Sequence, residues 1–339
     1  MTSKNLISQT RRRLARLGLA AGLVAALGSL PAAAQEITLR FGSPLPEDTL
    51  YHQAILRFAD EVATRSDGRL MIDVFPASQL GGIAEMLSSV QAGSLDMTMA
   101  VPAWYSGFIK PMDVFTLPYL VGSQDKLRPA LDGAVGDKIA ELGRSAGFEI
   151  VGYWLMGGRH IVNRVRPVHS PADLEGLKIR VINSQVYMTA FRALGANPVA
   201  MDPAELYLAL QNGVVDGFGY PLPDLIPYKL YEVADNLTLD THAIDFFVIS
   251  MSAGRWDGLA PEDQAIIEES MAVAMDWQWA EQPKAIEAAL EELRGLMTVT
   301  EISAEERQAF IDATRPIYGE FEESIGEDLM TTAVDALAN

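Results

Sequence analysis

The sequence of 339 residues contains no cysteine, which excludes disulfide bonds, thiolate metal sites and cysteine nucleophiles. Histidine is scarce, and none of His52, His160, His169 and His242 has the spacing of an H-E-x-x-H zinc motif. The sequence also lacks a phosphate-binding loop, a G-x-G-x-x-G motif and a G-x-S-x-G nucleophile elbow. We therefore expect no catalytic residues, no metal site and no cofactor, although the sequence leaves open whether a metal ion assists ligand binding.

Basic residues are few, with 26 Lys and Arg against 45 Asp and Glu and a formal net charge of −19. A surface this acidic repels phosphate backbones and anionic lipids, so we expect no nucleic-acid partner and no membrane-surface binding. Apolar residues make up 49% and charged residues 21%, which is ordinary for a folded globular protein. The length favours two domains of about 150 residues each.

Long apolar runs are missing as well. Residues 17–30 are uncharged and apolar, but they are fewer than the roughly 20 residues that a membrane span needs. Five basic residues precede this run without an acidic one, and Pro31 and three alanines follow it. This pattern is typical of a secretory signal peptide cleaved after Ala34. We therefore expect residues 1–34 to be removed and the mature chain to be exported without stable membrane insertion; the export route, Sec or twin-arginine, stays open.

Alternating strand and helix patterns follow the predicted leader. The first half predicts strands at 36–43, 69–75 and 95–101 and helices at 49–66 and 82–92. The second half predicts strands at 148–155, 177–182 and 214–219, a helix that begins near Asn183 or Ser184, and another at 202–212. The order β-α-β-α-β predicts an α/β fold with a mostly parallel sheet flanked by helices.

A short internal repeat suggests that the fold is duplicated. Residues 84–96 and 204–216 are identical at five of thirteen positions, and each copy predicts a helix, a glycine stop and a strand that begins near an Asp. Two similar lobes would place the carboxyl ends of their strands at a shared crevice, where ligands bind in such sheets. The helix predicted over 261–297 would span roughly 55 Å and connect both lobes, and Ser303 to Glu306 forms a capping box for a C-terminal helix.

Two arginines follow predicted strands. Arg180 lies at the carboxyl end of a buried strand and directly before a helix, where its guanidinium could bind a carboxylate with two hydrogen bonds. Arg159 follows Gly157 and Gly158, which we interpret as a tight turn leaving a strand. The alternative is that each arginine pairs with a structural Asp or Glu, and the strand-end position alone does not decide between the two.

Residues 174–222, LEGLKIRVINSQVYMTAFRALGANPVAMDPAELYLALQNGVVDGFGYPL, resemble the signature region of the DctP-type solute-binding proteins of TRAP (tripartite ATP-independent periplasmic) transporters. Residues 41–101, with FPASQLGG and AGSLDM, resemble the family too. The resemblance implies two lobes that close on a small organic acid in the periplasm, hinged by crossing strands and a long helix. It places lobe I at 35–157, completed by about 246–282, and lobe II at 158–245, completed by about 283–339.

The resemblance also implies the residues of a ligand site. The arginine of the K-[IL]-R-V strand, here Arg180, would form the carboxylate pair, and the arginine of the preceding G-x-R element, here Arg159, would support it. Tyr220 stands where the family commonly has Asn, and a phenol donates one hydrogen bond without the geometry of an amide. Carboxylate capture is therefore expected, and a polyhydroxylated acid is not.

Aromatic and apolar residues near the predicted strand ends also favour a ligand without many hydroxyl groups. Val101 stands near a position that is acidic in sialic-acid binders, and Trp104 and Phe218 would add an aromatic wall. Such a wall favours a monocarboxylate with an apolar or aromatic body. We assign Trp154, inside a predicted strand, to the core.

The sequence thus predicts a solute-binding protein, not an enzyme, that delivers its acid to the small and large membrane subunits of a TRAP permease. One alternative is an exported two-lobed enzyme acting on a small acid, for which His160, beside Arg159, is the one tempting base. Another is a sensor subunit that presents the same closed form to a receptor. The identity of the acid and the oligomeric state stay open.

Overall fold

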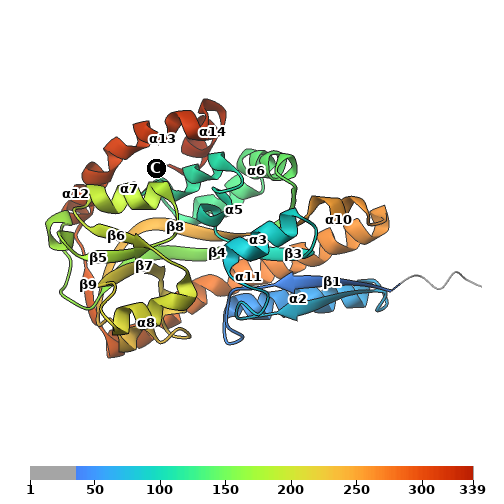
Figure 1. Ribbon diagram of the computed structural model, residues 1–339, viewed down its shortest axis with the longest axis horizontal. Coiled ribbons are helices and arrows are strands. Elements are labelled where there is room, and N and C mark those ends of the chain that lie inside the picture. Colours follow the sequence, from blue (N-terminus) through green and yellow to red (C-terminus); the bar gives the residue numbers. More distant parts are fainter. Residues whose placement is uncertain (1–35, 339) are drawn as a thin grey trace, which may run out of the picture. The chain divides into compact units, whose positions relative to one another are not determined.

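Two long antiparallel strands, β4 (Phe148–Asn163) and β8 (Asn236–Ser252), pair along their whole length through the middle of the sheet. A computed structural model describes residues 36–338. Within these residues one nine-stranded sheet has the order β2-β1-β3-β8-β4-β7-β5-β6, and β9 pairs with β8 (Figure 1). The predicted signal peptide lies outside the described residues.

The first predicted β-α-β-α-β unit forms one end of the sheet. It consists of β1 (Ile37–Gly42), α2 (Leu50–Arg65), β2 (Leu70–Phe75), α3 (Ile83–Gln91) and β3 (Met97–Ala100). The Thr49 side chain accepts a hydrogen bond from the His52 N–H and so caps α2. β1 pairs in parallel with β3, and β3 pairs antiparallel with β8. The short α4 (Pro102–Tyr105), α5 (Gln124–Leu131) and α6 (Ala134–Ser145) follow β3.

The second unit forms the other end of the sheet. It consists of β5 (Lys178–Val181), α7 (Gln185–Ala193), β6 (Asn197–Ala200), α8 (Leu206–Gln211), β7 (Gly217–Pro221) and the short α9 (Leu222–Leu225). β5 pairs in parallel with β6 and β7. The two copies of the predicted repeat both contain a helix that ends at a glycine. Gly93 after α3 and Gly213 after α8 have positive φ angles of 74° and 69°. β7 begins at Gly217, three residues later than expected.

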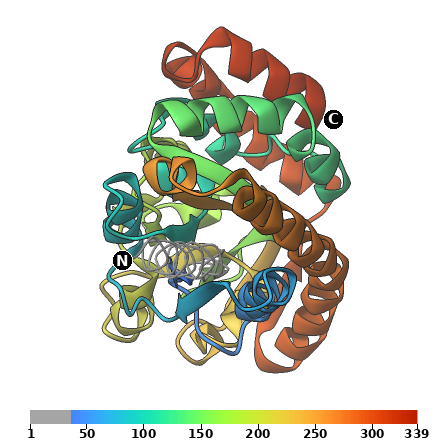
Figure 2. The same cartoon turned by 90° about the vertical axis from the view of Figure 1, so that its right-hand side faces the viewer.

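One long helix contacts elements from both halves of the chain. α11 (Pro261–Leu296) follows α10 (Ala253–Asp257), continues through Pro283, and packs against α2, β4 and α9 (Figures 1 and 2). After β9 (Thr298–Glu301) come α12 (Ala304–Thr314), α13 (Tyr318–Ile325) and α14 (Glu327–Leu337). The capping box from Ser303 to Glu306 is confirmed at the start of α12. No helix within residues 36–338 is long and apolar enough to span a bilayer.

The boundaries of the two predicted lobes stay a prediction, because the contacts within residues 38–339 join them into one unit. The C-terminal helices contact both halves: α12 packs against α7, whereas α14 packs against α5 and α6. The turn expected at Gly157–Gly158 is wrong, because β4 continues through it to Asn163.

Candidate functional site

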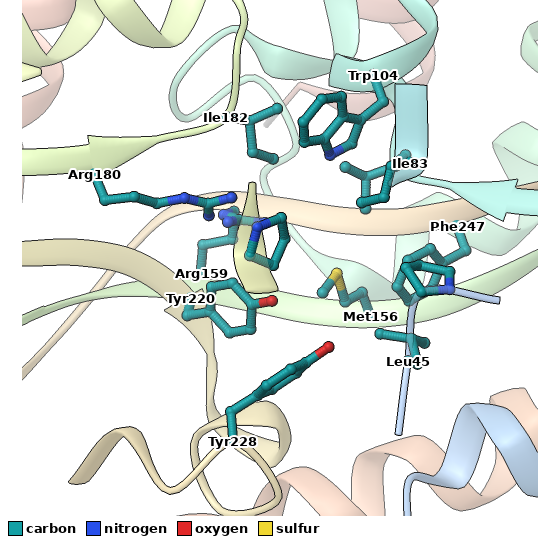
Figure 3. Close-up of a pocket in the computed structure, with 13 residues that line it drawn as sticks. Leu45, Ile83, Trp104, Met156, Arg159, Arg180, Ile182, Tyr220, Tyr228 and Phe247 are labelled. Carbon is teal, nitrogen blue, oxygen red and sulfur yellow. The ribbon is translucent and has the colours of Figure 1, made fainter. Parts of the chain in front are cut away.

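A cavity with about 390 Å³ of empty space, part of it open to solvent, lies at the carboxyl ends of β1, β3, β5 and β7. This is the position at which α/β sheets commonly bind ligands. The central strands β4 and β8 also contribute to it. Its lining consists of Pro44, Leu45, Ile83, Val101, Trp104, Met156, Arg159, Arg180, Ile182, Pro203, Tyr220, Tyr228 and Phe247 (Figure 3).

Arg180 is a buried cation without a carboxylate partner. It sits at the end of β5 and only 1% of the residue is exposed. Its Nε and Nη2 donate hydrogen bonds to the carbonyl oxygen of Met201, at 3.0 and 2.8 Å. No acidic side chain within residues 36–338 forms a salt bridge with it. Burial and the positive charge of Arg159 lower the pKa of Arg180 to about 10, so it remains charged at neutral pH.

Arg159, in contrast, has a charge partner. Its Nη1 lies 2.8 Å from Oδ2 of Asp245 on β8, and its Nη2 donates to the Gly219 carbonyl oxygen at 2.7 Å. Both charged side chains are buried, so this pair is shielded from solvent. The guanidinium also lies 5.3 Å from the ring centre of Tyr220. Arg159 therefore lines the cavity with its charge already balanced.

A bulge in β4 places Arg159 at the cavity. The pairing of β4 with β8 shifts register between Leu155 and Gly157. Gly157 has φ +105°, and a Cβ there would lie 2.7 Å from Cδ1 of Ile286 on α11. Only glycine fits this position without strain, so the sequence pattern that we interpreted as a turn is instead the bulge.

Two phenols face the arginines. The hydroxyl groups of Tyr220 and Tyr228 point into the cavity (Figure 3). Their rings meet edge to face with centres 6.0 Å apart. Burial raises the pKa of Tyr220 to about 12, so its hydroxyl remains a hydrogen-bond donor at neutral pH. The arginines and these phenols are the ionisable side chains that line the cavity.

The rest of the lining is apolar. Trp104, Ile182 and Ile83 lie together on one side of the cavity, and Met156, Leu45 and Phe247 lie on another (Figure 3). Val101, which stands between β3 and α4, also lines it. A ligand therefore meets one uncompensated positive charge, two hydroxyl groups and a wall of hydrocarbon.

The structure brings together Arg180, Arg159, Tyr220, Val101 and Trp104, but it places Phe218 elsewhere. Phe218 is fully buried in the core around α8, β7 and α9 and does not line the cavity. It shares a strand face with Tyr220 but lies two residues, about 7 Å, further from the strand end.

Trp154 is fully buried and does not line the cavity, as expected of a core residue. His160 does not line it either. It is buried, its Nδ1 accepts a hydrogen bond from the Thr241 N–H at 3.3 Å, and burial lowers its pKa to about 4. The base that the enzyme alternative invoked is therefore not in contact with this cavity.

Several lining residues were not anticipated. Pro44 and Leu45 follow β1, and Ile182 follows β5, so the strand-end rule applied to every strand would have found them. Tyr228 and Phe247 carry no such local signal. Tyr228 reaches the cavity from the loop after α9, and Phe247 reaches it from the middle of β8.

The fold and the cavity at its strand ends define a two-lobed solute-binding protein of the periplasmic type. The model of "Bacterial extracellular solute-binding protein, family 7" (DctP) matches residues 41–324, and the chain belongs to this family. Curated relatives of this chain are described as periplasmic binding proteins, and solved neighbours are described as TRAP periplasmic solute-binding proteins.

Three relatives illustrate the match. The chain is 34% identical to the 2,3-diketo-L-gulonate-binding periplasmic protein YiaO of Escherichia coli, over 86% of this chain and 88% of that protein. It is 30% identical to the C4-dicarboxylate-binding periplasmic protein DctP of Rhodobacter capsulatus, over 97% and 99%. Among solved structures, the sugar acid binding protein of Advenella mimigardefordensis in complex with galactonate has a TM-score of 0.87 at 30% identity, with 89% and 98% covered.

Proposed function

We propose that this protein binds a small monocarboxylate with an apolar or aromatic body and delivers it to a TRAP permease. The observation that carries the proposal is Arg180, a buried guanidinium that lines the cavity and has no carboxylate partner among the described residues. A buried cation is costly unless it is paired, and a ligand carboxylate would supply the pair. The planar guanidinium suits two parallel hydrogen bonds to such a group.

The charge balance supports one carboxylate rather than two. Asp245 already balances Arg159, which leaves Arg180 as the single uncompensated charge of the lining. A ligand with one negative charge would bring the buried site to neutrality, whereas a second carboxylate would enter without a partner. We therefore expect dicarboxylates to bind more weakly than monocarboxylates of similar size.

The apolar wall supports a hydrocarbon body. Each hydroxyl of a sugar acid would need a hydrogen-bond partner, and burial of an unpaired hydroxyl costs about 1–3 kcal/mol. Tyr220 and Tyr228 offer two such partners, while the opposite wall offers hydrocarbon. The second candidate is a sugar acid, since the YiaO and Advenella relatives are described as binders of 2,3-diketo-L-gulonate and galactonate.

The first prediction concerns Arg180. Titration calorimetry with phenylacetate, 4-methyl-2-oxopentanoate, succinate and galacturonate should show the tightest binding for one of the two monocarboxylates. Arg180→Ala should weaken that binding at least 100-fold, because loss of a buried charge-assisted pair costs roughly 3–5 kcal/mol. Arg192→Ala removes an exposed arginine of α7 and serves as the control. Unchanged affinity in Arg180→Ala would refute the role of Arg180, and preferential binding of galacturonate would favour the sugar-acid candidate.

A further inference from the structure

His242, on β8, is a buried histidine with one unpartnered ring nitrogen. Only 4% of the residue is exposed, and its Nδ1 donates a hydrogen bond to Oδ2 of Asp240 at 2.9 Å. Within residues 36–338 no group forms a hydrogen bond with its Nε2. A buried polar atom without a partner is costly. The proposed binding of an acid at Arg180 does not use this nitrogen, so its partner has still to be identified.

Asp240 determines the hydrogen-bonding character of Nε2. Its carboxylate is fully buried, and its Oδ1 accepts a hydrogen bond from the Ile161 N–H at 2.9 Å. Since an ionised carboxylate only accepts hydrogen bonds, the proton between Oδ2 and His242 belongs to Nδ1. The other nitrogen of a neutral imidazole is then an acceptor. Nε2 therefore needs a hydrogen-bond donor.

Nε2 lies at a small compartment beside the ligand cavity. The compartment has about 190 Å³ of empty space, part of it open to solvent, and its lining includes His242 and Gly219. Arg159, Arg180 and Ile182 line both this compartment and the ligand cavity, so the two spaces adjoin at the arginines. A Cβ at position 219 would lie 2.6 Å from Nε2. Glycine at this position therefore leaves room next to the nitrogen.

The polar groups of the compartment fit one kind of substituent. The guanidinium groups of Arg159 and Arg180 offer donors, Nε2 of His242 offers an acceptor, and the Tyr187 hydroxyl can act as either. A hydroxyl group can accept from a guanidinium and donate to Nε2 at the same time. A keto oxygen can only accept, and a methylene group can do neither. One hydroxyl group is therefore the substituent that satisfies both sides of the compartment.

The hydroxyl group belongs on the carbon next to the carboxylate. Arg180, the proposed partner of the ligand carboxylate, borders the compartment. The ligand substituent nearest to a carboxylate is the one on the adjacent carbon, and the body of the ligand continues toward the apolar lining with Trp104 and Phe247 (Figure 3). Carboxylate, hydroxyl and body then occupy three fixed points, and three points distinguish mirror-image ligands.

We propose that the compartment is a subsite for an α-hydroxyl group, so that the protein selects 2-hydroxy monocarboxylates of one hand. This inference rests on the proposed function and narrows its ligand class. His242 is the specificity-determining residue, because a ligand without the hydroxyl group leaves its Nε2 unpaired. Sites that pair a buried group with a ligand hydroxyl discriminate strongly against analogues that lack it.

The first experiment compares ligands that differ only at the α-carbon. Titration calorimetry at pH 8, where an ordinary imidazole is neutral and Arg180 is charged, uses phenylacetate and the two enantiomers of mandelate. One enantiomer of mandelate should bind about 10- to 100-fold more tightly than phenylacetate. One enantiomer of 2-hydroxy-4-methylpentanoate should likewise bind more tightly than 4-methyl-2-oxopentanoate. Failure in both pairs would overturn the subsite, because water would then serve Nε2 as well as the hydroxyl group does.

The second experiment removes the acceptor. His242→Asn keeps an amide donor in place of Nδ1 for Asp240 but lacks the Nε2 end of the ring. In this variant mandelate should lose its advantage, whereas phenylacetate should bind about as tightly as to wild type. His169→Asn removes an exposed histidine and should retain the full advantage. An advantage of unchanged size in His242→Asn would overturn the role of His242.

A measurement on the wild-type protein covers the case in which His242→Asn does not fold. With ¹⁵N-labelled histidine, the preferred enantiomer of mandelate should shift the ring ¹⁵N signal of one of the four histidines relative to the phenylacetate complex. Identical histidine spectra in the two complexes would refute the contact with Nε2.

The subsite and the proposed function fail in different ways. If phenylacetate and 4-methyl-2-oxopentanoate bind through Arg180 and the hydroxy acids bind no more tightly, the subsite is refuted and the proposed function stands. If none of these acids binds, the proposed function fails and this inference fails with it.

Discussion

Arg180 is held by one backbone carbonyl group and by no carboxylate within the described chain, whereas Arg159 is neutralised by Asp245. The two arginines of one site thus have different tasks. Arg180 keeps its positive charge available for a ligand. Arg159 is held in place at the cavity by its hydrogen bonds to Asp245 and to the Gly219 carbonyl oxygen. Residue type and strand-end position indicated Arg180, whereas Arg159 lies inside β4 and was indicated by a strand end that the structure does not have. The identity of their partners depended on Gly219, Met201 and Asp245, which are distant in sequence.

At the residue scale we predict that His160 makes stability fall in mild acid. Burial lowers its pKa to about 4, below the roughly 6.5 of an exposed histidine, so the unfolded chain binds a proton that the folded chain refuses. The contribution is complete above pH 6.5 and is lost as the pH falls toward 4. Between pH 6.5 and pH 4, urea unfolding should show the free energy of unfolding of wild type falling by up to about 3 kcal/mol more than that of His160→Asn.

His169→Asn is the control for this prediction, because the His169 side chain is exposed and its one acidic contact among the described residues is the surface pair with Glu306, at 2.9 Å. Such a pair contributes about 0–1 kcal/mol, so the pH dependence of this variant should stay within about 1 kcal/mol of that of wild type. Equal pH dependence of wild type and His160→Asn would contradict the burial argument. Asn is chosen at position 160 because its oxygen can still accept the hydrogen bond from Thr241.

At the scale of elements, α11 does more than cover the sheet. Its buried Gln278 bonds both backbone groups of Leu155: Oε1 accepts from the N–H at 2.9 Å and Nε2 donates to the carbonyl oxygen at 2.7 Å. Gln282, one turn on, donates to the carbonyl oxygen of Met156 at 2.9 Å. These glutamines satisfy the backbone at the point where the β4 bulge interrupts its pairing with β8.

We therefore predict that Gln278→Leu is strongly destabilising. Two buried backbone groups would lose their partners, at about 1–3 kcal/mol each, so the free energy of unfolding should fall by roughly 2–6 kcal/mol. Urea unfolding monitored by circular dichroism measures the change. Gln308→Leu, on the exposed side of α12, should change stability by less than about 0.5 kcal/mol. A small effect at Gln278 would mean that the bulge is satisfied in another way.

The elements themselves were largely predictable from the sequence. Hydrophobic periodicity and capping residues located α2, α3, α11 and α12 within a few residues. The error at Gly157 has a clear cause: a glycine pair after a strand indicates positive φ equally well for a turn and for a bulge. Only the strand partner and the helix behind it distinguish the two.

At the scale of the whole molecule, β4, β8 and α11 are shared by both predicted lobes, and they form the proposed hinge. The apolar lining comes from both halves of the chain, since Trp104 and Ile83 belong to the first half and Ile182 to the second. A ligand that contacts residues of both halves stabilises the closed arrangement over an open one.

We predict that a bound acid closes the molecule. In small-angle X-ray scattering, saturating phenylacetate or 4-methyl-2-oxopentanoate, whichever binds more tightly, should reduce the radius of gyration of the wild-type protein. Arg180→Ala, treated with the same acid, should show no reduction. A decrease of equal size in the variant would mean that closure does not depend on the carboxylate.

The sequence by itself determined the alternation of strands and helices, the strand-end position of Arg180 and the family resemblance, because these depend on local pattern and on order along the chain. Within residues 36–338, tertiary structure decided which arginine keeps a free charge, and that Phe218 belongs to the core while Tyr228 and Phe247 reach the cavity. Those properties are set by contacts between residues far apart in the chain, and a one-dimensional pattern does not encode which distant groups meet.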